Sequence, residues 1–107
     1  MRPDSPVARA HAAVAEVLRP GDLAVDATAG NGHDTRFLAE RVGPEGRVHA
    51  LDVQEAAVAA TRQRLTEAGL AERVHLHHCG HEHLAEAVPP AHHGRVRVVM
   101  FNLGYLP

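Results

Sequence analysis

Residues 23–35 read LAVDATAGNGHDT, a short apolar strand followed by a glycine turn and the start of a helix. Gly30 and Gly32 place no side chains where a ligand would approach the backbone, and the predicted helix N-terminus offers free N–H groups and a partial positive charge. Asp52 stands twenty residues after Gly32, at the end of the next apolar segment. A carboxylate there can accept hydrogen bonds from a ribose diol. The stretch therefore predicts a binding site for a nucleotide-like cofactor.

The rest of the chain continues the alternation of strands and helices. A helix is predicted from Pro6, capped by Ser5 and ended by Pro20, with one apolar face. That face is assigned to Val7, Ala10, His11, Val14, Val17 and Leu18. The later elements are strand 23–27, helix 34–42, strand 47–52, helix 55–68, strand 73–78, short helix 84–88 and strand 95–101, with an αL cap at Gly69. This order predicts a doubly wound, mostly parallel α/β sheet whose ligand lies beyond the strand ends, where Asp26, Asp52, Gly80 and Asn102 fall.

Length and composition narrow the classes of protein. A chain of 107 residues with 45% apolar residues forms one domain at most. All 11 basic residues are arginines, and with 13 acids the formal charge is −2, so no global basic field points to nucleic acid. The single cysteine, Cys79, and the lack of an apolar leader favour a reducing cytoplasm. No apolar run is long enough to span a membrane, so no membrane partner is expected.

Two cofactor classes use a glycine turn and an acid after the next strand, namely dinucleotides and S-adenosylmethionine. A dinucleotide fingerprint requires a third glycine where Thr35 stands. Asp26 would also repel a pyrophosphate, whereas it could receive the ammonium of a methionine group. The turn therefore favours S-adenosylmethionine, and a nicotinamide-dependent oxidoreductase is the weaker alternative.

Four segments in order resemble a known family: VDATAGNGHDT at 25–35, LDVQEAAVAATRQRL at 51–65, CGHEHL at 79–84 and FNLGYLP at 101–107. They are similar to the Rossmann-like, S-adenosylmethionine-dependent methyltransferases, and more narrowly to the small rRNA methylase family. The resemblance runs from about Ala10 to Pro107 and departs from the wider class at Thr28, where a glycine is usual. It implies methylation of the aminomethyl group of a tRNA wobble uridine. An rRNA methyltransferase and a cofactor-binding remnant without activity remain the alternatives.

The resemblance also implies the roles of single residues. Asp26 would hold the ammonium and Asp52 the ribose, with Asn102 orienting the substrate amine and Tyr105 stacking on a base. The full set of predicted cofactor contacts is Asp26, Ala27, Gly30, Asn31, Gly32, Asp34, Thr35, Asp52, Gln54, Gly80 and His81. The expected strand order is 3-2-1-4. Sheets of the family hold more strands than the four predicted here, so residues 1–107 are expected to be the cofactor-binding part of one domain, truncated after the fourth strand. The exposed edge would then favour pairing with a second copy.

Each of these residues also has a structural interpretation. The glycines could form a plain tight turn, Asp26 a helix cap, Asp52 a solvated loop acid and Asn102 a turn residue, while Phe101 and Tyr105 could be core residues. Histidines crowd residues 75–83 together with Cys79. Alternation along a strand sends His75 and His77 to the face opposite His78, so convergence on a structural metal is not expected. His11 is interpreted as a packed, hydrogen-bonded residue on an apolar helix face.

Overall fold

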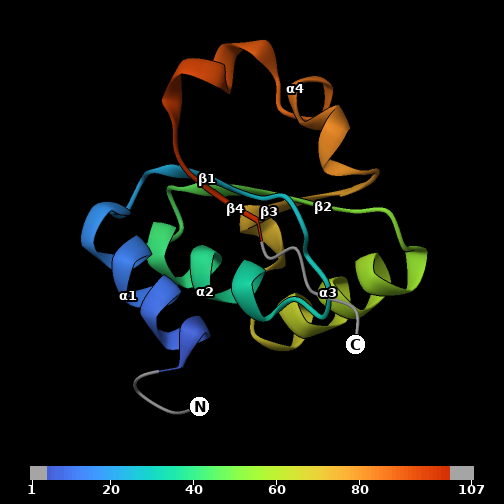
Figure 1. The fold of residues 1–107 in the computed structure, drawn as a ribbon, viewed down its shortest axis with the longest axis horizontal. Helices are drawn as coiled ribbons and strands as arrows, with labels where there is room; N and C mark the ends of the chain where they lie inside the picture. Colours follow the sequence, from blue (N-terminus) through green and yellow to red (C-terminus); the bar gives the residue numbers. More distant parts are fainter. Residues whose placement is uncertain (1–4, 102–107) are drawn as a thin grey trace.

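The computed structural model describes residues 5–101, which form a parallel four-stranded sheet between two unequal helical layers (Figure 1). The strands are β1 Leu23–Asp26, β2 Arg47–Asp52, β3 Val74–His78 and β4 Val96–Met100. They lie in the order β3-β2-β1-β4, and all three pairings are parallel. Both the α/β fold and the strand order predicted above are confirmed, and the strand ends come together at one edge of the sheet.

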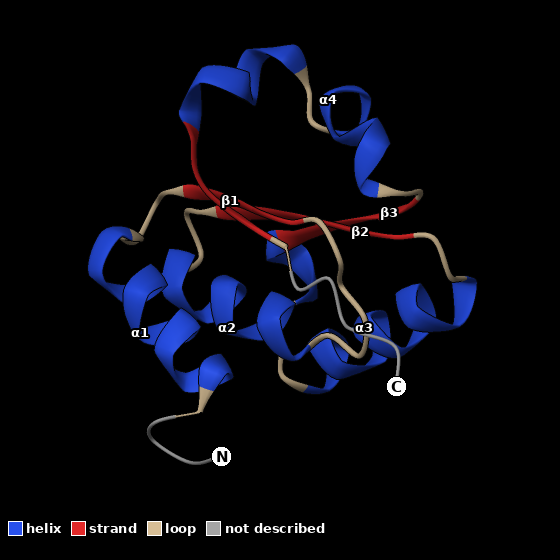
Figure 2. Cartoon of the chain, in the orientation of Figure 1, coloured by secondary structure: helices blue, strands red, loops and turns tan. Residues whose placement is uncertain are grey.

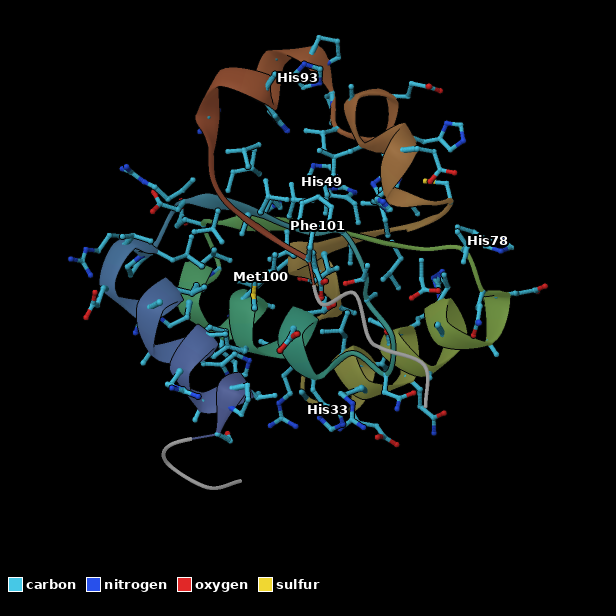
Figure 3. All side chains as sticks on the ribbon, viewed as in Figure 1. His33, His49, His78, His93, Met100 and Phe101 are labelled. Carbon is cyan, nitrogen blue, oxygen red and sulfur yellow. The ribbon has the colours of Figure 1, made fainter. Side chains whose placement is uncertain are left out.

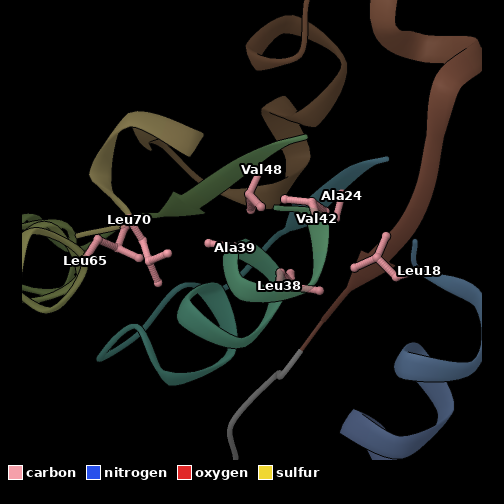
Figure 4. Packing of buried hydrophobic residues seen from close by; sticks show 8 residues of the cluster. All are labelled: Leu18, Ala24, Leu38, Ala39, Val42, Val48, Leu65 and Leu70. Atoms are coloured by element: carbon pink, nitrogen blue, oxygen red, sulfur yellow. The ribbon is translucent and has the colours of Figure 1, made fainter. Parts of the chain in front are cut away.

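One face of the sheet is covered by α1 (Pro6–Val17), α2 (His33–Val42) and α3 (Glu55–Glu67), as Figure 2 shows. The other face carries a thinner layer made of η2 (His81–His83), α4 (Leu84–Ala87) and η3 (Pro90–Arg95), while η1 (Ala71–Arg73) leads into β3. The main core lies under the thicker layer (Figure 4) and consists of Leu18, Ala24, Leu38, Ala39, Val42, Val48, Leu65 and Leu70. A smaller core of Val25, Leu51 and Val88 lies under α4. Strands buried on both faces explain the apolar sequences of β1 and β2.

The helix ends follow the sequence closely. The Ser5 side chain accepts a hydrogen bond from the Ala8 N–H at 3.0 Å, as an N-cap does. Gly69 has a φ of +73°, and the N–H of Leu70 donates to the Leu65 carbonyl at 2.9 Å. This is the Schellman arrangement, which places Leu70 in the core.

The predicted apolar face of α1 needs correction, whereas the predicted edge of the sheet does not. Val7 and Val17 are 43% and 49% exposed and Ala10 is also exposed. Of the six predicted residues, only His11, Val14 and the C-cap residue Leu18 are turned inward. The exposed sheet edge predicted for the fourth strand is confirmed, because no described strand pairs with the outer edge of β4. Val99 in this edge strand is 41% exposed. The edge position agrees with the strand order that the resemblance implied.

Candidate functional site

The glycine turn between β1 and α2 lies at the carboxyl end of the sheet. Gly30 and Gly32 have φ values of +56° and +89°, which favour glycine at both positions. A Cβ added at Gly30 would make only an ordinary van der Waals contact, 3.9 Å from the Thr28 carbonyl oxygen, whereas one at Gly32 would lie 3.0 Å from the Cα of Thr61. Gly30 thus leaves room for a ligand, while Gly32 is required by the close approach of α3.

Asp52 at the end of β2 is bound to the turn. Its Oδ2 accepts the Gly30 N–H at 2.9 Å, and its Oδ1 accepts the Gln54 N–H at 2.9 Å. Each carboxylate oxygen can accept a second hydrogen bond, so the half-buried Asp52 can still bind two hydroxyl groups. Beside it lies a hollow of about 330 Å³, lined by Gly30, Asn31, Asp52, Gln54, Ala56 and Ala57.

Asp26 is fully buried beneath the turn. The Thr35 hydroxyl donates to its Oδ2 at 2.6 Å, and the Thr28 N–H donates to its Oδ1 at 3.2 Å. Burial raises the pKa of Asp26 from 3.8 to about 6, against the effect of these two hydrogen bonds and with a smaller contribution from Asp34 and Asp52. Thr35, which is also buried, therefore supports Asp26 from within the fold. The neighbouring Ala27 N–H is part of the sheet, since it donates to the Met100 carbonyl at 2.8 Å.

Asp34 in the first turn of α2 is paired with α1. Its Oδ1 lies 2.7 Å from Nε2 of His11, and both side chains are largely buried. The His11 ring stacks on Phe37 with the ring centroids 3.9 Å apart. The packed and hydrogen-bonded role predicted for His11 is confirmed. The pair also places an imidazole beside the start of the helix that follows the turn.

Residues that follow β3 and β4 come into contact, although these two strands lie at opposite edges of the sheet. His81 is exposed after β3, and its ring meets Phe101 edge-on at 5.6 Å (Figure 3 labels Phe101). Gly80 is buried, and its carbonyl accepts the His83 N–H at 3.0 Å. Asn102 and Tyr105 lie outside the described residues, so their roles stay predictions from the sequence.

The histidines form a cluster that the sequence did not reveal. His49 of β2 lies among His75, His77 and His92, a group called the histidine cluster below. His49 Nδ1 is 3.0 Å from His77 Nε2. Strand alternation sends His78 elsewhere, to the Val53 carbonyl at 2.9 Å. Within residues 5–101, no three His, Cys, Asp or Glu side chains are placed to hold a metal ion; the lack of a native metal stays a prediction.

Sequence reasoning also missed two α3 residues that contact the turn. The Thr61 hydroxyl donates to the Gly30 carbonyl at 3.0 Å, and Arg64 Nε donates to the Asn31 carbonyl at 2.8 Å. Both residues lie on the same side of α3, but no local pattern in the sequence linked them to a turn about 30 residues earlier. Across the described range, no helix has the length and apolarity needed to cross a bilayer.

Comparison with known proteins gives consistent matches. The family model described as "Putative rRNA methylase" matches residues 48–107. A putative rRNA-methylase from Clostridium thermocellum has a crystal structure that superimposes with a TM-score of 0.89 and 40% identity, covering 100% of this chain and 55% of that one. A putative methyltransferase from Streptococcus mutans in complex with SAH gives a TM-score of 0.82 and 36% identity, covering 97% and 55%.

Two curated relatives act on RNA, as their names state. The chloroplastic tRNA (mnm(5)s(2)U34)-methyltransferase of Arabidopsis thaliana is 41% identical, over 92% of this chain and 38% of that protein. The ribosomal RNA small subunit methyltransferase H of Ralstonia nicotianae is 36% identical, over 92% of this chain and 29% of that protein. This chain thus spans well under half the length of these curated relatives.

Proposed function

Because the chain belongs to the rRNA methylase family, we propose that it forms the cofactor-binding part of an S-adenosylmethionine-dependent RNA methyltransferase. The observation that carries this proposal is the hydrogen bond that the Gly30 N–H donates to Asp52, beside an open hollow. A ribose acceptor and a glycine turn thereby meet at the carboxyl edge of a parallel sheet, where such folds bind nucleotides.

The charge of the site favours this cofactor over a dinucleotide. Asp34 and Asp52 both help to raise the pKa of Asp26, so three carboxyl groups share a small region at the end of β1. A pyrophosphate would be repelled there, whereas an ammonium and a sulfonium would be attracted. Thr35 also stands where the dinucleotide fingerprint needs a glycine, and its hydroxyl is committed to Asp26.

The residues present suggest a division of roles. Asp52 and Gln54 would bind the ribose, and the backbone of Gly30, Asn31 and Gly32 would lie along the cofactor. Asp26 and Asp34 would supply negative charge near the ammonium, and Gly80 with His81 would border the adenine. When bound, S-adenosylmethionine supplies an electrophilic methyl group whose sulfur leaves uncharged. The chain's own contribution is therefore alignment and exclusion of water rather than acid catalysis at the leaving group.

We further propose a tRNA substrate, the aminomethyl group of the wobble uridine. The support is the name of the 41% identical Arabidopsis thaliana relative together with the FNLGYLP segment, in which Asn102 would orient the amine and Tyr105 would stack on a base. The ribosomal RNA methyltransferase relative supports rRNA as the second candidate. A cytoplasmic location belongs to this proposal, because Cys79 is the only cysteine.

Isothermal titration calorimetry with S-adenosylhomocysteine tests the cofactor assignment, with NAD as the competing ligand. Asp52→Ala is expected to weaken S-adenosylhomocysteine by about ten- to a hundredfold, because a charge-assisted hydrogen bond contributes about 1.5–3 kcal/mol. Glu72→Ala is the matched control, since Glu72 is exposed in η1 at the opposite end of the strands. Unchanged affinity in Asp52→Ala, or tighter binding of NAD, would refute the assignment.

Nucleoside mass spectrometry tests the substrate. Hypomodified tRNA and rRNA are treated with the 107-residue chain and with the longest translation product that contains it. Methylaminomethyl uridine is expected from the longer product, and Asn102→Ala should lower its turnover more than its cofactor affinity. The 107-residue chain is expected to show little turnover. Methylation of rRNA alone would replace the proposed substrate.

A further inference from the structure

The glycine turn is held on its far side by two residues of α3. Thr61 is fully buried, and its Oγ1 donates to the Gly30 carbonyl at 3.0 Å. Arg64, three residues later on the same side of the helix, donates from Nε to the Asn31 carbonyl at 2.8 Å. The two successive carbonyls that follow the tip of the turn are thus both bound by one helix.

We infer that Thr61 and Arg64 are positioning residues that hold the turn in the shape that accepts the cofactor. This inference rests on the proposed function of the turn. Neither side chain lines the hollow beside Asp52. Both would therefore act through Gly30 and Asn31, which do line the hollow.

The hydrogen bonds of Gly30 explain why this brace would affect affinity. Its N–H donates to Asp52 Oδ2 at 2.9 Å, while its carbonyl accepts from Thr61. The peptide groups on the two sides of one residue are therefore tied to different elements, β2 and α3. Gly30 and Gly32 both have positive φ values and much conformational freedom, so an unbraced turn would populate other shapes. Cofactor affinity falls in proportion to the population of the competent shape.

Thr61→Val tests the brace because valine has the shape of threonine without the hydroxyl donor. We expect S-adenosylhomocysteine to bind about two- to tenfold more weakly, the range of one neutral hydrogen bond. Thr61→Ser restores the donor and should restore the affinity. Thr66→Val is the matched control, because the hydroxyl of the exposed Thr66 donates to the Arg62 carbonyl of its own helix and not to the turn. Arg64→Met should weaken binding, whereas Arg62→Met, on the exposed side of the helix, should not.

Amide exchange of Gly30 and Gly32, followed by NMR without ligand, separates positioning from general stability. Thr61→Val should speed exchange at these two amides about two- to tenfold and leave the amides of β2 unchanged. A double-mutant cycle with Asp52→Asn should show non-additive losses of affinity, since both side chains hold Gly30.

Three results would overturn the inference: wild-type affinity in Thr61→Val, failure of serine to rescue it, or unchanged exchange at Gly30. If the wild-type chain binds no S-adenosylhomocysteine, the proposed function fails. The exchange rates then still decide whether α3 braces the turn.

Discussion

Replacing His49 by glutamine should make the protein resist acid better than the wild type does. His49 is 2% exposed, and its ring contacts those of His75, His77 and His92 at 5.1, 5.3 and 5.9 Å (Figure 3 labels His49). Its Nε2 is buried without a hydrogen-bond partner in the described part of the chain. A proton placed on this ring would therefore be poorly solvated and close to other imidazoles.

The size of the effect follows from the pKa of His49. Burial, and then the neighbouring His75, His77 and His92, lower this pKa from 6.5 to about 4. Below pH 6.5 the unfolded chain takes up a proton that the folded protein refuses until about pH 4. The free energy of unfolding therefore falls as the pH falls through this window, by up to about 3 kcal/mol at about 1.36 kcal/mol per pH unit. The pKa of His77 is lowered in the same direction, by burial and by His75.

Asp26 opposes this trend in the wild type. Its pKa is raised from 3.8 to about 6, so the folded protein binds this proton more readily and gains stability as the pH falls. Between pH 4 and 6, the unfolding free energy of the wild type consequently changes less with pH than His49 alone would make it change. The informative quantity is the difference in unfolding free energy between His49→Gln and the wild type.

Urea unfolding followed by circular dichroism at a series of pH values measures this difference. It should shift by about 3 kcal/mol in favour of the variant between pH 6.5 and pH 4. His33→Gln, an exposed substitution at the start of α2, should follow the wild-type pH dependence. A difference that stays constant across this pH range would refute the reasoning.

Three further results are expected. In urea titrations, Gly69→Ala should lower the unfolding free energy by about 1–2 kcal/mol, and Gly32→Ala should lower it further. Both glycines have positive φ values, but only at Gly32 would the added Cβ meet Thr61. Equal losses in the two variants would contradict this. If the ammonium of S-adenosylhomocysteine lies near Asp26, binding near pH 6 should release protons from this carboxyl group. Calorimetry in buffers of different ionisation enthalpy detects this release. A binding enthalpy that does not depend on the buffer would contradict the placement of the ammonium near Asp26. In sedimentation velocity, the 107-residue chain should self-associate through the edge of β4, and Val99→Arg should reduce this association. A monomeric wild type would show that the edge is covered.

Much of the candidate site was readable from local sequence. Strand ends, helix starts and turns depend on residues within a few positions of one another, so the glycine turn, the end of β2 at Asp52 and the cap at Gly69 all fell where predicted. The strand order came from the resemblance, and the sheet has it.

Contacts between distant residues were decided by the tertiary structure alone. Periodicity gave α1 an apolar stripe, but the packing of α1 against its neighbours determined that His11 faces inward while Val7 and Val17 face outward. Asp26 was predicted to receive a ligand, and only the fold shows its carboxylate engaged by Thr35 and Thr28. The spacing of residues in the sequence does not determine which side chains of separate layers come into contact, because these contacts depend on the angles at which the elements pack. The brace of α3 on the turn and the histidine cluster between β2, β3 and η3 both arise in this way.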